Sequence, residues 1–181
     1  VMISPDFTTF WSQAAQQGFK PKIVSIGEAL LFPASIEALG DRGDGLTSEI
    51  WWSPNHPFKS SLTGQSAKEL ADAYTAASGK PWTQPLGFAH SIFEVAFDVI
   101  KRTKDLSSAE SILEAIVATE LQTITGPVGW KGGPNNPVKN VCKTPLVGGQ
   151  WNKTEKGYDL VITANPQQPD IPVGGKLELL S

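Results

Sequence analysis

The sequence predicts an α/β protein with parallel sheets flanked by helices, and two observations carry this prediction. Strand-like apolar runs alternate with helix signals over residues 1–52, an order typical of parallel strands joined by helical crossovers. Three consecutive helical segments follow, and short strand-like segments return after residue 120. The predicted strands cover residues 1–3, 23–26, 47–52, 121–125, 128–130, 146–151 and 158–163.

The first helix is predicted to begin at the Ser4-Pro5-Asp6 segment. Ser4 is a typical N-cap, proline is favoured at the first helical position, and an acid stabilises the first turn. Gly18 then ends the helix. A shorter helix over residues 33–39 is predicted to end at Gly40.

Three helices are predicted in the middle of the chain. Ser66 and Glu69 form a capping-box pattern before a helix that ends near Ala77. The second helix covers residues 85–102, and the third begins after the Ser107-Ser108 pair. Since no strand separates these helices, we expect them to cover a sheet supplied by chain outside this sequence.

A rigid segment follows the third predicted strand. Trp51 and Trp52 precede Pro54 and Pro57, which exclude a helix and disfavour a central strand. Because successive side chains of a strand face opposite sides, one tryptophan is expected in the core and the other is free to line a cleft. We assign the ligand-contacting role to Trp52. The chain after Asn165 is predicted to be extended or poorly ordered.

Composition excludes several classes of partner. Charged residues make up 18% of the 181 residues, the formal net charge is -3, and lysines and arginines form no run, which argues against nucleic acid or an anionic membrane. No stretch approaches the apolar length of a transmembrane helix. Cys142 is the single cysteine, so no disulfide forms within these residues and the compartment stays open.

Few residues are candidates for metal binding or ligand binding. His90 and Glu94 have the spacing of two metal ligands on a helix, but His56 is the only other histidine, so we favour a structural or cleft-facing histidine and expect no metal or cofactor. Glu28 follows an apolar strand, where an acid either receives a ligand's ammonium group or is simply solvated. The free N–H groups near Ser4 are suited to a carboxylate.

Several short motifs occur in a characteristic order. They are Gly18-Phe19-Lys20-Pro21, Ala38-Leu39-Gly40-Asp41 with Gly45, Ala71-Asp72-Ala73-Tyr74 with Gly79-Lys80-Pro81, the helix from Gly87 to Ala96, Gly126-Pro127-Val128 and Gly148-Gly149-Gln150-Trp151. Over residues 1–163 this order resembles the C-terminal half of the leucine/isoleucine/valine-binding protein family. These proteins are periplasmic solute-binding receptors of ABC importers.

The resemblance implies the C-terminal part of a two-lobe type I periplasmic binding protein, whose α/β lobes are joined by three crossing strands. Residues 1–52 would belong to the second lobe and residues 53–145 to the first. Residues 146–163 would cross back into the second lobe, and residues 164–181 would form an extended tail. The first lobe's own sheet would lie upstream of this sequence.

The resemblance also implies a function: a periplasmic receptor that closes by a hinge on a small amino-acid-like or aromatic acid ligand and delivers it to an ABC permease. The expected ligand contacts are Ile3, Ser4, Glu28, Trp52, Phe88 and His90. The alternative is a ligand-binding sensory domain of the same fold. An α/β hydrolase ranks third, because the sequence contains no Gly-x-Ser-x-Gly nucleophile motif.

Overall fold

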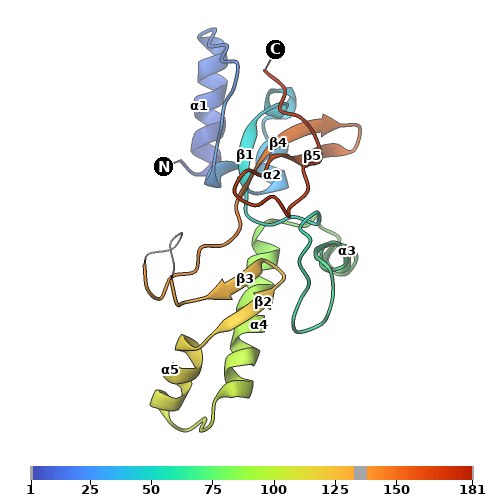
Figure 1. The fold of residues 1–181 in the computed structure, drawn as a ribbon. Coiled ribbons are helices and arrows are strands. Elements are labelled where there is room, and N and C mark those ends of the chain that lie inside the picture. The colour runs from blue at the N-terminus through green and yellow to red at the C-terminus, as the bar shows by residue number, and fades with distance from the viewer. Residues whose placement is uncertain (1, 133–137, 181) are drawn as a thin grey trace. The chain divides into compact units, whose positions relative to one another are not determined.

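The computed structural model describes residues 2–132 and 138–180, which divide into two compact units (Figure 1). Unit 1 contains the described residues of 1–50 and 146–181. Unit 2 contains those of 51–145. The chain therefore enters unit 2 between Ile50 and Trp51 and leaves it between Pro145 and Leu146. The assignment of these segments to two receptor lobes stays a prediction.

Unit 1 combines one long helix with an antiparallel sheet. Its strands β1 (Thr47–Ile50), β4 (Val147–Thr154) and β5 (Gly157–Ala164) lie in the order β1-β4-β5. The helices are α1 (Ser4–Gln16) and α2 (Pro33–Glu37), with the 3₁₀ turns η1 (Glu28–Leu30) and η2 (Gly40–Gly43) between and after them. Phe7 and Trp11 are the buried residues of α1, and their rings stack with centroids 6.1 Å apart.

The α/β class is confirmed, but the predicted parallel pairing is nearly absent from the described strands. Both ladders of the unit 1 sheet are antiparallel. A turn of only two residues, Glu155 and Lys156, joins β4 to β5, and such a short connection permits no parallel pair. Parallel contact is confined to a bridge between Ser25 and Thr47, where Thr47 N–H donates to Val24 O at 3.0 Å. Val1 lies outside the described residues, and the rest of segment 1–3 forms no strand.

Backbone and side-chain hydrogen bonds anchor the C-terminal tail to unit 1. Residues 165–180 contain no helix or strand. Gly174 N–H donates to Ile162 O and Leu180 N–H donates to Lys22 O, both at 2.9 Å. These hydrogen bonds hold the tail against the rest of unit 1, and its description as an extended tail stays a prediction.

Unit 2 contains the three predicted helices and a hairpin. They are α3 (Ala67–Ser78), α4 (Pro85–Arg102) and α5 (Ala109–Val117), followed by β2 (Glu120–Thr123) paired antiparallel with β3 (Gly126–Gly129). The capping box is confirmed, because Ser66 Oγ accepts from Glu69 N–H while the Glu69 carboxylate accepts from Ser66 N–H. The buried core consists of Trp52, Ala67, Ala71 and Ile124.

An apolar face of α4 and α5 is exposed in this structure. Ile92 and Phe93 of α4 are 68% and 61% exposed, and Leu113 of α5 is 59% exposed. Amphipathic helices normally bury such a face against a sheet or another helix. The expectation that a sheet from outside this sequence covers these helices stays a prediction.

Candidate functional site

Candidate ligand-binding residues occur in each unit, and the two groups are described separately. In unit 1 a cavity of about 450 Å³ lies beside the start of α1. Its lining comprises Met2, Phe7, Phe10 and residues 24–29. The helix start and the turn that follows the predicted strand 23–26 thus meet at one cavity, which combines apolar rings with the carboxylate of Glu28. We call it the α1 cavity.

Ser4 connects α1 to the rest of unit 1. Its hydroxyl donates to Ala29 O at 2.8 Å and accepts from Ser35 Oγ at 2.9 Å. The structure places Ile3 at the N-cap position and Ser4 as the first helical residue, so Ser4 makes no cap hydrogen bond. Its proton is already used within the protein, and a ligand would have only the remaining lone pair of Ser4 Oγ to bind.

Glu28 is the exposed first residue of η1 and lines the α1 cavity. Ala29, which follows it, is buried and receives the hydrogen bond from Ser4. Two of the predicted contacts, Ser4 and Glu28, are therefore brought to one place by contacts between residues 25 positions apart. Ile3 is 57% exposed next to them.

In unit 2 the two tryptophans differ in burial, as the alternation of side chains along a strand predicts. Trp52 has no exposed surface, and its indole N–H donates to Ile124 O at 3.1 Å. Trp51 is half-buried, and its ring meets Phe88 edge-on with centroids 6.0 Å apart. The assignment of ligand contact to Trp52 is corrected here, because a ring enclosed in the core cannot touch a solute. Trp51 takes its place in what we propose below.

The backbone of Trp51 is held by a buried side chain. Gln84, which is 1% exposed, accepts a hydrogen bond from Trp51 N–H at 2.7 Å. Trp51 thus has a fixed position beside the start of α4. Gln84 was not among the predicted site residues, because a glutamine just before Pro85 offers no local signal for a contact 33 residues away.

His90 and Phe88 are half-buried residues of α4. His90 Nε2 lies 2.7 Å from Ser60 Oγ. That oxygen already accepts from the N–H groups of Leu62 and Thr63, both at 3.1 Å, so its proton points to the imidazole and His90 carries its own proton on Nδ1. His90 can then donate one hydrogen bond from Nδ1.

Glu94 has a structural role that differs from metal binding. It is 1% exposed, and its carboxylate accepts from Ser61 N–H, from Ser61 Oγ and, at 3.0 Å, from Ile124 N–H. His90 and Glu94 therefore hold two neighbouring serines of one loop. The described residues contain no group of three or more acidic, histidine or cysteine side chains placed to hold a metal ion.

His56 is buried in unit 2 and is held neutral by its surroundings. Its Nδ1 accepts from Ser53 N–H at 3.1 Å, which leaves the proton on Nε2, where no partner lies among the described residues. Burial lowers the pKa of His56 to about 4, because the charged imidazolium is disfavoured away from water. A buried neutral imidazole of this kind affects the stability of the fold and is not placed to contact a ligand.

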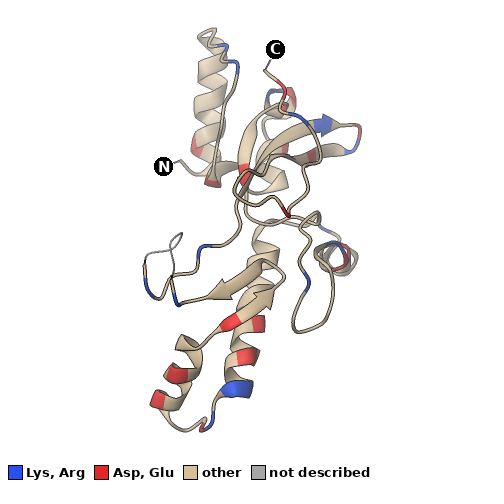
Figure 2. Cartoon of the chain, in the orientation of Figure 1, with Lys and Arg blue, Asp and Glu red and all other residues tan. Residues whose placement is uncertain are grey.

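Charge on the described surface follows the predicted pattern. Lysines and arginines are scattered along the chain and gather on no single element (Figure 2). Among residues 2–132 and 138–180, no helix has both the length and the apolar character needed to cross a membrane. Cys142 is half-buried, and its thiol lies 3.7 Å from Pro127 O.

Comparison with known proteins identifies a family. A family model described as periplasmic binding protein matches residues 1–154. A search of curated proteins finds no match. Among solved structures, a leucine-binding protein from Thermotoga maritima MSB8 has a TM-score of 0.66 at 21% sequence identity, with 91% of this chain and 43% of that chain covered.

Two further solved structures show the same fold. A putative branched-chain amino acid ABC transporter protein from Silicibacter pomeroyi has a TM-score of 0.68 at 12% identity, covering 99% of this chain and 45% of that one. A solute-binding protein from Rhodopseudomonas palustris BisB5, solved with 3,4-dihydroxybenzoic acid, has a TM-score of 0.63 at 17% identity, covering 90% and 43%. The chain spans less than half the length of these proteins.

Proposed function

Since this chain belongs to the periplasmic binding protein family, we propose that it is part of an extracytoplasmic solute-binding receptor of an ABC importer. The observation that carries the proposal is the family match over residues 1–154, and the type I fold of the solved neighbours supports it. We propose a receptor rather than an enzyme, located in the periplasm and delivering its ligand to an ABC permease.

The proposed ligand is a small amino-acid-like molecule or an aromatic acid. In unit 1 the proposed contacts are Ile3, Ser4 and Glu28, next to the apolar rings of the α1 cavity. In unit 2 they are Trp51, Phe88 and His90. Aromatic faces suit a hydrophobic or aromatic body, and a carboxylate suits an ammonium group. One neighbour is named a leucine-binding protein and another was solved with an aromatic acid, which supports this range of ligands.

The proposed mechanism is closure of two lobes on the ligand. Residues 1–52 and 146–163 would belong to the second lobe and residues 53–145 to the first, with residues 52–58 and 146–163 as the crossings between the lobes. Each lobe would contribute part of the contacts, so the closed state would be stabilised only when the ligand touches both. The segment with Pro54 and Pro57 would restrict the backbone next to one hinge.

Thermal-shift screening of the full-length gene product against amino acids and aromatic acids tests this proposal. A bound ligand raises the melting temperature because it binds the folded state alone. Absence of any shift across the panel, with turnover of an ester or amide instead, would exclude the receptor. The 181-residue chain alone should bind the same ligand far more weakly, because it would lack part of the contacts.

The role of Glu28 is tested by Glu28→Gln in the full-length protein. We expect affinity for an amino acid to fall by about tenfold or more, because a charge-assisted hydrogen bond is lost, while affinity for an aromatic acid without an amino group changes little. Glu155→Gln, which removes an exposed acid in the turn between β4 and β5, is the matched control. Unchanged amino-acid affinity in Glu28→Gln would remove Glu28 from the site.

A further inference from the structure

The first connection between the two units consists of a single residue, Trp51. Ile50, the last residue of unit 1 before the connection, has no exposed surface. Trp52 has none either, and its indole N–H donates to Ile124 O within unit 2. Both chain neighbours of Trp51 are therefore fixed in the interior of a unit, and Trp51 is the half-buried residue between them.

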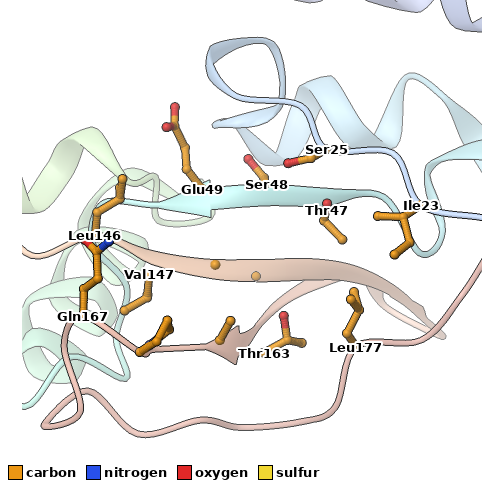
Figure 3. Close-up of a pocket in the computed structure, with 14 residues that line it drawn as sticks. Ile23, Ser25, Thr47, Ser48, Glu49, Leu146, Val147, Thr163, Gln167 and Leu177 are labelled. Atoms are coloured by element: carbon orange, nitrogen blue, oxygen red, sulfur yellow. The ribbon is translucent and has the colours of Figure 1, made fainter.

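The return connection has the same form but more freedom. Leu146 is 46% exposed, and it lies between the buried Pro145 of unit 2 and the buried Val147 of unit 1. Leu146 and Val147 line a cavity of about 440 Å³ along β1 and β4, and Figure 3 shows both residues where β4 begins. The side chain of Leu146 thus has open space beside it within unit 1.

Trp51 differs from Leu146 because a side chain of unit 2 holds its backbone. Gln84 lies immediately before α4, yet its side chain makes no cap hydrogen bond to this helix. Its Oε1 instead accepts from Trp51 N–H at 2.7 Å, and the residue is 1% exposed. Since glutamine is not a preferred N-cap residue, the contact with Trp51 explains this buried glutamine better than helix capping does.

The hydrogen bond from Trp51 to Gln84 also distinguishes two adjacent indoles. Because successive side chains of an extended chain alternate, a shift by one residue would bring Trp51 into the core and turn Trp52 outward. Trp52 packs on Gly87, where a Cβ would lie 2.3 Å from its Cγ, while Gln84 holds the N–H of Trp51. These contacts keep the Trp51 ring beside Phe88, with centroids 6.0 Å apart and planes at 71°.

We propose that Gln84 is a positioning residue for the ligand site of unit 2. It is buried and touches no ligand itself, and it acts by holding Trp51 where the indole ring contacts the ligand. The inference rests on the proposed function, in which Trp51 is a ligand contact. Without the hydrogen bond Trp51 would sample other positions, and ligand affinity falls with the fraction of molecules that keep the binding position.

Gln84→Met in the full-length gene product tests the proposal, with L-phenylalanine and benzoate as the probes. Methionine keeps the length of the side chain and removes the accepting oxygen. If Trp51 keeps the binding position in about a tenth of the variant molecules, isothermal titration well below the melting temperature should show about tenfold weaker binding.

Two further variants separate the positioning role from other effects of the substitution. Gln84→Glu keeps an accepting oxygen in either protonation state, so it should restore most of the affinity for the probes. Gln122→Met changes an exposed glutamine of β2 in the same unit and is the matched control. It should bind both probes as the wild-type protein does.

The position of Trp51 is tested without ligand in the 181-residue chain. Its amide should exchange slowly in the wild-type chain and in Gln84→Glu, and rapidly in Gln84→Met. With 5-fluorotryptophan incorporated, the fluorine resonance of Trp51, assigned through Trp51→Phe, should shift or broaden in Gln84→Met. The resonance of Trp11, which lies in unit 1, should stay unchanged.

Three outcomes would overturn the proposal. The first is a wild-type Trp51 amide that exchanges as fast as an unprotected amide, a result that requires no variant to fold. The second is wild-type affinity in a Gln84→Met protein that melts at a lower temperature, which would make Gln84 purely structural. The third is equal loss of affinity in Gln84→Glu and Gln84→Met, which would assign the effect to the amide nitrogen of Gln84.

Failure of the proposed function gives a different result. The wild-type full-length protein would then bind neither probe, nor any other member of the thermal-shift panel. The exchange and fluorine measurements on the 181-residue chain decide in that case whether Gln84 holds Trp51.

Discussion

Glu94 accepts two hydrogen bonds from Ser61, one from its backbone N–H at 2.5 Å and one from its hydroxyl at 2.8 Å. The other carboxylate oxygen accepts from Ile124 N–H. One buried carboxylate thus joins α4 to the loop before α3 and to the chain after β2. The same loop is held by His90 through Ser60. The position of His90, a proposed ligand contact, and of the loop with Ser60 and Ser61 therefore depends on Glu94.

Glu94→Gln should destabilise unit 2 by about 2–4 kcal/mol. The amide has one accepting oxygen and one donating nitrogen, so the nitrogen must face either Ser61 or Ile124, both of which present N–H donors. Urea denaturation followed by tryptophan fluorescence measures the loss. Glu114→Gln, an exposed acid on α5, is the control and should change the midpoint little. Equal midpoints for the two variants would contradict the structural role of Glu94.

His56 should make stability depend on pH. Its pKa is about 4 in the folded protein, because burial disfavours the charged imidazole, whereas the unfolded chain has the ordinary value near 6.5. Between pH 6.5 and 4 the unfolded state therefore binds a proton that the folded state excludes. The free energy of unfolding should fall as the pH falls through this range, by up to about 3 kcal/mol.

Denaturation midpoints measured from pH 7.5 down to pH 4 test the His56 prediction. His56→Asn is the informative variant, because its side-chain oxygen can still accept from Ser53 N–H while the titrating ring is gone. We expect the variant to lose most of this pH dependence. The same pH dependence in both proteins would assign the effect to other groups.

Local patterns predicted the helices of unit 2 well, because their signals lie within a few residues. The Ser66–Glu69 capping box and the bounds of α4, with Pro85 at its start, are such cases. The pairing of the strands was predicted less well, since the direction of a partner depends on segments a hundred residues apart, as with Thr47 and Gln150.

The candidate site was predictable only where local sequence decides the position of a residue. The alternation of Trp51 and Trp52 was clear, but which ring is buried depends on Gly87, and nothing in the local sequence indicates that contact. The place of Ser4 likewise depends on a hydrogen bond to Ala29. Such contacts follow from tertiary structure, which hydrophobic periodicity does not encode.

Gly87→Ala should destabilise unit 2 by about 1–3 kcal/mol. A Cβ at this position would lie 2.3 Å from Trp52 Cγ, so the helix or the indole must move. The clash opposes the gain in helix propensity of about 1 kcal/mol that alanine usually brings. Melting temperature and the near-ultraviolet circular dichroism of the tryptophans report the change.

The combination of Gly87→Ala with Trp52→Phe tests whether the clash with the indole causes the destabilisation by Gly87→Ala. A smaller ring leaves room for the methyl group, so the double variant should be more stable than the sum of the two single effects predicts, by about 1 kcal/mol. If the two changes in the free energy of unfolding simply add, the destabilisation by Gly87→Ala has another cause, such as a change in backbone flexibility of α4.

Gln150 should control whether the C-terminal tail stays on unit 1. Its side chain is fully buried, its amide nitrogen donates to Gly45 O and to Glu178 O at 2.8 Å each, and its oxygen accepts from Glu178 N–H at 3.0 Å. Gln150→Leu keeps the volume but leaves these three backbone groups without partners, at a cost of about 2–4 kcal/mol. Part of this cost disappears if the tail detaches and its groups bind water.

Amide hydrogen exchange distinguishes a local detachment from global unfolding in Gln150→Leu. We expect Glu178 and Leu180 to lose protection first, because Leu180 N–H donates to Lys22 O from the same tail segment. Amides of β4 and β5 should remain protected under conditions where the tail has opened. Gln13→Leu, at an exposed position of α1, is the matched control and should change neither set. If Glu178 keeps wild-type protection in Gln150→Leu, the tail is held by its apolar contacts instead, such as that between Leu180 and Gly45.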